Sequence, residues 1–125
     1  MFDEKRKEMR FPAFIEISAR DSQRKKSALG IIRDFSRDGI KAIFDNFNLD
    51  SGSQIDLKIH NPQEDAYFPA TAEVKWRKSL NGKFEVGLKF RDFVPQVKAD
   101  ILEYCYRNWL KKRLFSTSLS NSGKI

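Results

Sequence analysis

The chain has 125 residues, of which 33% are charged, 40% are hydrophobic and 13% are aromatic. This length suits one soluble domain with a single core, which needs neither a metal nor a disulfide for its stability. The single cysteine, Cys105, excludes an intramolecular disulfide and a cysteine-rich zinc site. No apolar run approaches the roughly 20 residues of a membrane span, and the charged amino terminus lacks the apolar stretch of a signal peptide. We therefore expect a cytoplasmic protein without a membrane span.

The chain is basic, with 24 Lys and Arg against 17 Asp and Glu, a formal charge of +7. Four of these surplus charges lie between Val97 and Ile125, where six basic residues face two acidic ones, so three are spread over the first 96 residues. Cations near the end of a terminal helix complement the helix dipole without any ligand. A basic barrel that binds single-stranded nucleic acid is an alternative interpretation. The nearly balanced charge of the first 96 residues weakens it.

Apolar and polar residues alternate over short stretches, which is typical of half-buried strands. The predicted strands are Phe11 to Ala19, Ser27 to Phe35, Gly39 to Asp45, Gln54 to His60, Tyr67 to Arg77 and Lys83 to Arg91. Turn residues separate them, and the Asn81-Gly82 pair favours a tight hairpin. Many short strands favour a sheet that closes into a barrel. The predicted fold class is therefore all-β with a C-terminal helix: a six-stranded antiparallel β-barrel over residues 12–91.

A helix is predicted over residues 95–115, because Pro95 suits a first helical turn and no Gly or Pro follows before Phe115. The side chains expected to pack on the barrel recur at helical spacing and are Val97, Ile101, Tyr104, Cys105 and Trp109. The Ser-rich residues 116–125 are predicted to form a disordered tail.

A second apolar line on this helix, formed by Tyr106, Leu110 and Leu114, is displaced around the helix axis. One interpretation, which we favour from the sequence, is that the helix is buried on two sides of one domain. The other is that the line meets a second copy of the chain, as a homodimer, or a partner protein.

Catalysis finds little support in the sequence. The one histidine, His60, has no Cys, Ser or carboxylate pattern around it that would form a nucleophilic or metal-binding set. Cys105 lies on the predicted core face of the helix, where an unreactive small hydrophobe is usual. Neither a G-x-G-x-x-G sequence nor a P-loop occurs. We expect no enzyme activity, no metal and no cofactor.

Two short sequence patterns contain side chains that could bind a ligand. The first is R-x-x-x-R, formed by Arg6 and Arg10 just before the first predicted strand. An arginine presents a planar fork of donors that grips a phosphate or the O6 and N7 edge of guanine. Alone the spacing is weak, because Arg20 and Arg24 repeat it in this Arg-rich chain, and solvated charge is the simpler interpretation.

The second pattern is D-x-S-x-x-G, formed by Asp34, Ser36 and Gly39 between two predicted strands. In extended chain Asp34 and Ser36 share a face, so a carboxylate able to accept from guanine stands beside a hydroxyl. Gly39 would permit the positive φ of a tight turn. In isolation, the favoured interpretation is an ordinary hairpin in which Asp and Ser bond their own backbone.

In this order, the two patterns resemble the signature of the PilZ domain family, R-x-x-x-R followed by D/N-x-S-x-x-G. The resemblance runs from about Lys5 to Leu110 and includes the strand order, the stretch VGLKF and the C-terminal helix. It implies a PilZ domain over residues 1–115 with an N-terminal switch loop over residues 1–11.

The resemblance implies a receptor for the bacterial second messenger cyclic di-GMP. Arg6 and Arg10 would contact guanine edges and phosphates, and the opposing barrel wall would be formed by Asp34, Ser36 and Gly39. Trp76 either contributes to the ligand face, as in some family members, or serves ordinary cross-strand packing. Ligand would order the switch loop and change the surface seen by a downstream protein partner. A PilZ-like adaptor that acts through protein contacts alone is the rival hypothesis.

Overall fold

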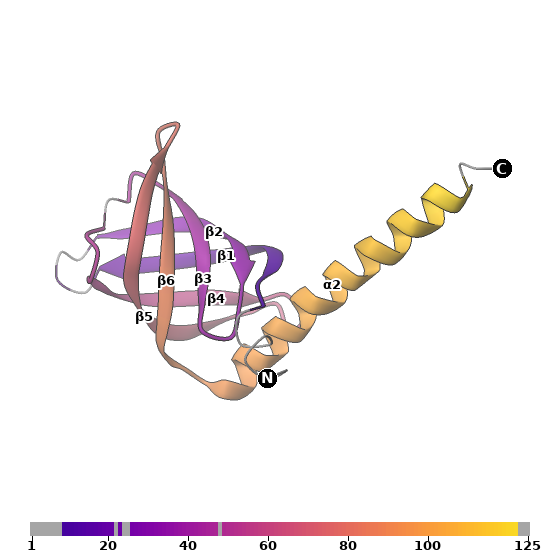
Figure 1. Ribbon diagram of the computed structural model, residues 1–125. Coiled ribbons are helices and arrows are strands. Elements are labelled where there is room, and N and C mark those ends of the chain that lie inside the picture. The colour runs from indigo at the N-terminus through magenta and orange to yellow at the C-terminus, as the bar shows by residue number, and fades with distance from the viewer. Residues whose placement is uncertain (1–8, 22, 24–25, 48, 123–125) are drawn as a thin grey trace.

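The computed structural model describes residues 9–21, 23, 26–47 and 49–122, with side chains in the C-terminal helix described as far as Leu114. Six strands are followed by one long helix (Figure 1). Their bounds are β1 (Phe11–Asp21), β2 (Ser27–Phe35), β3 (Gly39–Asp45), β4 (Gln54–Asn61), β5 (Ala66–Leu80), β6 (Lys83–Phe93) and α2 (Pro95–Ser122). The six predicted strands are all present, and β2 and β3 have the predicted ends.

The strands form a closed barrel in the order β1-β2-β3-β6-β5-β4, with every pair antiparallel. The predicted fold class is therefore confirmed. Closure places β3 beside β6, where Gly39 pairs with Lys89 and Asp45 with Lys83, although β4 and β5 intervene in the sequence. The β5–β6 hairpin turns at Asn81 and Gly82, which both have positive φ as a type I′ turn requires.

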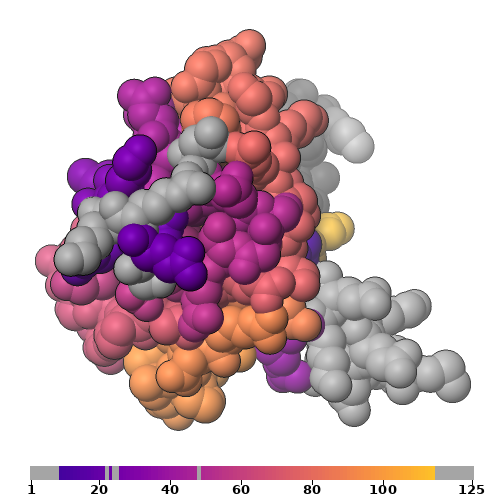
Figure 2. Space-filling model, turned by 90° about the vertical axis from the view of Figure 1, so that its left-hand side faces the viewer, coloured from indigo at the N-terminus to yellow at the C-terminus, as the bar shows by residue number. Residues whose placement is uncertain are grey.

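The inward side chains of the strands fill the barrel with apolar groups. The largest of them include Ile15, Ile32, Phe35 and Phe44, which are almost completely buried. The segment after β3 adds the buried Leu49. Figure 2 shows the side of the barrel away from the projecting part of α2, where purple and magenta segments of the first half of the chain lie beside salmon and orange segments of the second half.

One face of α2 packs on the barrel as predicted. Ile101 and Cys105 belong to the buried core, and the partly buried side chains against it include Val97, Tyr104 and Trp109. The helix continues to Ser122 instead of ending near Phe115, because the first residue after Pro95 that strongly disfavours a helix is Gly123. Within the described residues, α2 is too polar to cross a membrane.

The second apolar line of α2 is exposed, with exposed fractions of 43% for Tyr106, 37% for Leu110 and 61% for Leu114. The expectation that α2 is buried on two sides of one domain is therefore wrong. The physical reason is visible in Figure 1: the helix leaves the barrel at an angle, so only its first half has barrel surface beside it.

Burial has a chemical consequence at Cys105. It raises the pKa of the thiol to about 12, whereas an exposed cysteine has a pKa of about 8.5. At pH 8 we expect iodoacetamide to label native Cys105 at least roughly a hundredfold more slowly than the chain unfolded in guanidinium, because only the thiolate reacts. Mass spectrometry over a time course measures both rates. Equal rates would contradict the burial of this side chain.

Candidate ligand-binding site

A polar cavity of about 290 Å³ lies where the start of β3 meets β5 and β6. Its lining comes from four segments that are distant in the sequence and consists of Arg10, Asp38, Gly39, Ile40, Lys75, Trp76, Gly87, Leu88 and Lys89. Three of the residues singled out from the sequence, Arg10, Gly39 and Trp76, are thus brought together. Arg6 lies outside the described residues.

Asp34 connects the two motifs directly. The Nε of Arg10 donates to Oδ1 of Asp34 at 2.7 Å, and the Nζ of Lys41 lies 3.4 Å from Oδ2 of the same carboxylate. The Arg10 side chain remains 46% exposed, and its guanidinium has further N–H donors that can reach a ligand. The first motif therefore meets the second at an ion pair on the rim of the cavity.

Ser36 holds the turn between β2 and β3. Its buried hydroxyl donates to the Gly39 carbonyl at 2.9 Å and accepts from the Gly39 amide at 3.2 Å. The Ser36 amide also donates to the Gly39 carbonyl at 2.9 Å. These bonds are those of the ordinary hairpin, so the Ser36 hydroxyl shapes the loop from inside while the Asp34 carboxylate points to Arg10 and Lys41.

The expected positive φ at Gly39 is wrong, because Gly52 and Gly82 are the glycines of the described residues that have it. A glycine is required here instead because the backbone of β6 lies very close to position 39. A Cβ on Gly39 would lie 2.1 Å from the carbonyl oxygen of Leu88 on β6, far inside any van der Waals contact.

Trp76 makes the expected cross-strand contact and also lines the cavity. Its indole packs on Gly87 of β6, where a Cβ would lie 2.2 Å from the indole Nε1. The residue nevertheless remains 42% exposed and lines the cavity. It therefore makes a cross-strand contact with one part and presents a flat aromatic surface with the other.

The charge at the site is mainly positive. Lys75 and Lys89 join Arg10 in the lining, which contains the carboxylate of Asp38. Lys41 lies beside Asp34, and Lys75 lies 3.1 Å from Glu73. No local motif marks Lys41, Lys75 or Lys89 in the sequence. The β2–β3 register places Lys41 opposite Asp34, and the β3–β6 and β5–β6 registers bring Lys89 and Lys75 to the same site.

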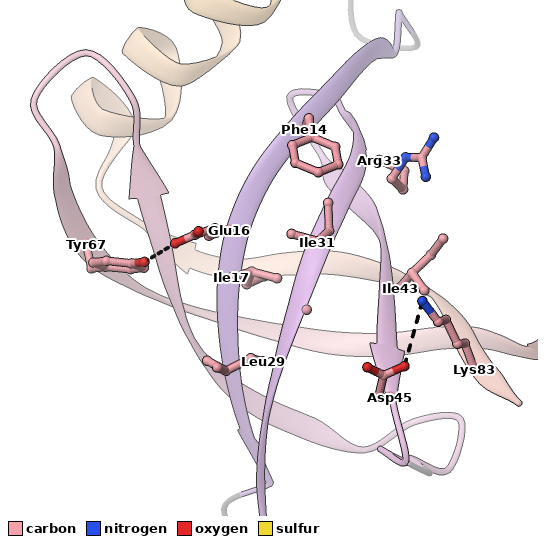
Figure 3. Close-up of a pocket in the computed structure, with 11 residues that line it drawn as sticks. Phe14, Glu16, Ile17, Leu29, Ile31, Arg33, Ile43, Asp45, Tyr67 and Lys83 are labelled. Atoms are coloured by element: carbon pink, nitrogen blue, oxygen red, sulfur yellow. Dashed lines mark hydrogen bonds and ion pairs between the residues drawn. The ribbon is translucent and has the colours of Figure 1, made fainter.

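A wider hollow lies on the outer wall of the barrel (Figure 3) and contains none of the predicted site residues. Its apolar lining is Phe14, Ile17, Leu29, Ile31 and Ile43. At one margin the Tyr67 hydroxyl donates to Glu16 at 2.5 Å, a bond that raises the pKa of the phenol above its ordinary value. At the other, Lys83 lies 4.0 Å from Asp45.

The fold is a closed six-stranded antiparallel barrel followed by one C-terminal helix, with a polar cavity where Arg10 reaches the start of β3. The family model of the PilZ domain matches residues 4–107. The chain belongs to the PilZ domain family. No curated protein sequence matches the chain.

Solved structures share the fold at low sequence identity. The Bacillus subtilis inhibitor of motility, MotI/DgrA, superposes with a TM-score of 0.70 at 19% identity over 82% of this chain and 50% of its own. The PilZ domain with c-di-GMP of YcgR from Escherichia coli gives 0.65 at 12% identity over 88% of this chain and 95% of its own. K. pneumonia MrkH gives 0.66 at 11% identity over 88% and 51%. The chain therefore spans about half the length of MotI/DgrA and MrkH.

Proposed function

We propose that this chain is a receptor for cyclic di-GMP that changes its surface for a downstream protein partner when the ligand binds. The observation that carries the proposal is the convergence of Arg10, Gly39 and Trp76 on one cavity, with Asp34 bonded to Arg10. Membership of the PilZ family and the fold shared with the c-di-GMP complex of YcgR support it.

The chemistry of the site suits a ligand with two guanines and two phosphates. Arg10 supplies a planar donor fork, and Lys75 and Lys89 supply positive charge for phosphates. The Asp34 carboxylate can accept from the N1–H and 2-amino group of a guanine. Trp76 offers an exposed aromatic face on which a base can stack. In this proposal Arg6 provides the second fork.

Ligand binding also requires a rearrangement. The Asp34 carboxylate already accepts from the Nε of Arg10, so a guanine that donates to this carboxylate must displace or share that bond and shift the Arg10 side chain. Next to Arg10, the ring of Phe11 contacts α2, with centroids 5.6 Å from Tyr106 and 5.8 Å from Trp109. Moving Arg10 therefore acts on the surface where α2 leaves the barrel, which provides the change that a downstream partner would detect.

Calorimetric titration tests the receptor function. We expect cyclic di-GMP to bind with a dissociation constant in the low micromolar range or tighter, which corresponds to roughly 8 kcal/mol or more. GTP and cyclic di-AMP should bind at least tenfold more weakly, because each offers only part of the guanine and phosphate set. Absence of heat and of a thermal shift at saturating ligand would contradict the receptor proposal. Ligand-independent capture of one specific protein would then favour the adaptor hypothesis.

Trp76 gives a second test. Replacing Trp76 with alanine should weaken binding by at least fivefold, because base stacking on an aromatic ring contributes roughly 1 to 3 kcal/mol. Trp76→Phe should retain most of the affinity but lose the ligand-dependent change in tryptophan fluorescence. Trp109→Phe is the matched control and should keep that change. A Trp76→Ala variant with wild-type affinity would remove this residue from the binding site.

A further inference from the structure

The exposed face of α2 carries a continuous line of side chains, which we name the α2 ridge: Ala99, Glu103, Tyr106, Leu110 and Arg113. Their spacing alternates between four and three residues, the period that keeps side chains in line along one face of a helix that packs on another helix. Leu102 and Leu114 flank the ridge on its two sides.

The second half of the ridge stands clear of the barrel. Each side chain from Leu110 to Leu114 is exposed, and Figure 1 shows the helix projecting away from the strands. A helical segment that buries no apolar face is only marginally stable in water. An apolar surface of a partner would therefore stabilise the projecting segment.

The first half of the ridge borders a groove of about 740 Å³. The barrel side of this groove consists of Met9, Phe11 and Arg37. The helix side consists of Ala99, Leu102, Glu103, Tyr106 and Trp109. An apolar side chain from a second helix can enter here beside Leu102.

We propose that a second copy of the chain covers the α2 ridge, with the two α2 helices antiparallel about a twofold axis between Tyr106 and Leu110. In this register Tyr106 lies opposite Leu110 of the partner subunit. Leu102 and the groove receive Leu114 of the partner subunit. Glu103 lies opposite Arg113 of the partner subunit. The same contacts recur on both sides of the axis, as a twofold interface requires.

Charge decides the direction of the pair. Residues 98–103 of α2 carry Asp100 and Glu103 against Lys98, whereas residues 107–113 carry four cations: Arg107, Lys111, Lys112 and Arg113. Arg107 already pairs with Glu103 of its own helix at 2.7 Å, so Arg113 of the partner subunit is the second cation at this carboxylate. An antiparallel arrangement brings the acidic stretch of each helix to the basic stretch of the other, but a parallel one would set the two basic stretches side by side. Because apolar and charged positions match in one register, a second copy fits the ridge better than an unrelated helix.

Sedimentation equilibrium without cyclic di-GMP tests the proposal independently of ligand binding. We expect a mass of twice 14.6 kDa at concentrations of roughly 100 µM. Leu110→Asp and Leu114→Asp should each weaken the dimer at least tenfold. The matched control is Leu29→Asp on β2, whose leucine is also exposed but lies in the hollow of Figure 3. A monomeric wild type at roughly 500 µM, or equal loss in the control, would overturn the proposal.

Disulfide trapping tests the register. Mixing the Glu103→Cys and Arg113→Cys variants under mild oxidation should give a cross-linked dimer, since the two positions face each other in the antiparallel pair. Arg113→Cys alone should not cross-link, because its copies lie far apart. Cys105 can remain in both variants, because its thiol is buried. Cross-linking of Arg113→Cys with itself, with none in the mixture, would show a parallel pair and overturn the proposal.

Charge exchange completes the test. Glu103→Arg and Arg113→Glu should each weaken association at least threefold, since each sets like charges opposite one another. The double variant should restore it. Failure of the double variant to recover affinity, with each variant's helix content unchanged by circular dichroism, would contradict the pairing of Glu103 with Arg113.

Discussion

Replacing Arg10 with alanine is expected to weaken cyclic di-GMP binding more than tenfold, a loss of at least about 1.5 kcal/mol. The free energy of unfolding should change by less than about 1 kcal/mol, because the Arg10–Asp34 ion pair lies at the surface with the arginine side chain 46% exposed. Calorimetry measures the affinity, and urea unfolding measures the stability. A large loss of affinity with a small change in the free energy of unfolding would identify Arg10 as a ligand contact.

Arg10→Lys separates charge from geometry. Lysine keeps the positive charge but lacks the planar fork, so this variant should lose most of the affinity as well. Arg20→Ala is the matched control, because Arg20 is an exposed arginine on β1 that lines a different hollow. A wild-type affinity in Arg10→Lys would show that charge attraction alone is sufficient. Equal losses in Arg10→Ala and Arg20→Ala would show that the wrong arginine has been assigned to the ligand.

Replacing Gly39 with alanine is expected to lower the free energy of unfolding by about 2 to 3 kcal/mol, within the usual range for an overpacked site. The new Cβ would lie 2.1 Å from the Leu88 carbonyl oxygen and 3.2 Å from the Lys89 Cα. Both are backbone atoms, so no side-chain rotation can relieve the overlap and β3 must move away from β6. Because the cavity lies at this junction, cyclic di-GMP affinity should fall with the stability. Urea unfolding and calorimetry measure the two effects.

Gly82→Ala provides the control for Gly39→Ala. Gly82 has a positive φ of 82° but open space around its Cα. Alanine there should cost only about 1 kcal/mol of backbone strain and leave cyclic di-GMP binding intact, since the hairpin tip lies away from the cavity. If both variants lost stability equally and both bound ligand, the close approach of Gly39 to β6 would have no role in the site.

The local sequence determined the elements of this protein. Alternation of apolar and polar residues predicted six strands, because a half-buried strand must place every second side chain inside the barrel. Pro95 and the helical spacing of Ile101 and Cys105 predicted the start and the buried face of α2. The two motifs marked Arg10 and Asp34, whose direct bond is a finding of the structure.

Only the tertiary structure decided what those elements meet. The pairing of β6 with both β3 and β5 brings Lys75 and Lys89 to the site, although nothing near them in sequence distinguishes these lysines from solvated ones. The β3–β6 pairing requires a glycine at position 39 for space, where the local sequence suggested a turn conformation. The angle of α2 leaves Leu110 exposed although its spacing allowed burial. Periodicity records which face of an element is apolar, whereas contacts between distant segments depend on how the whole chain closes on itself.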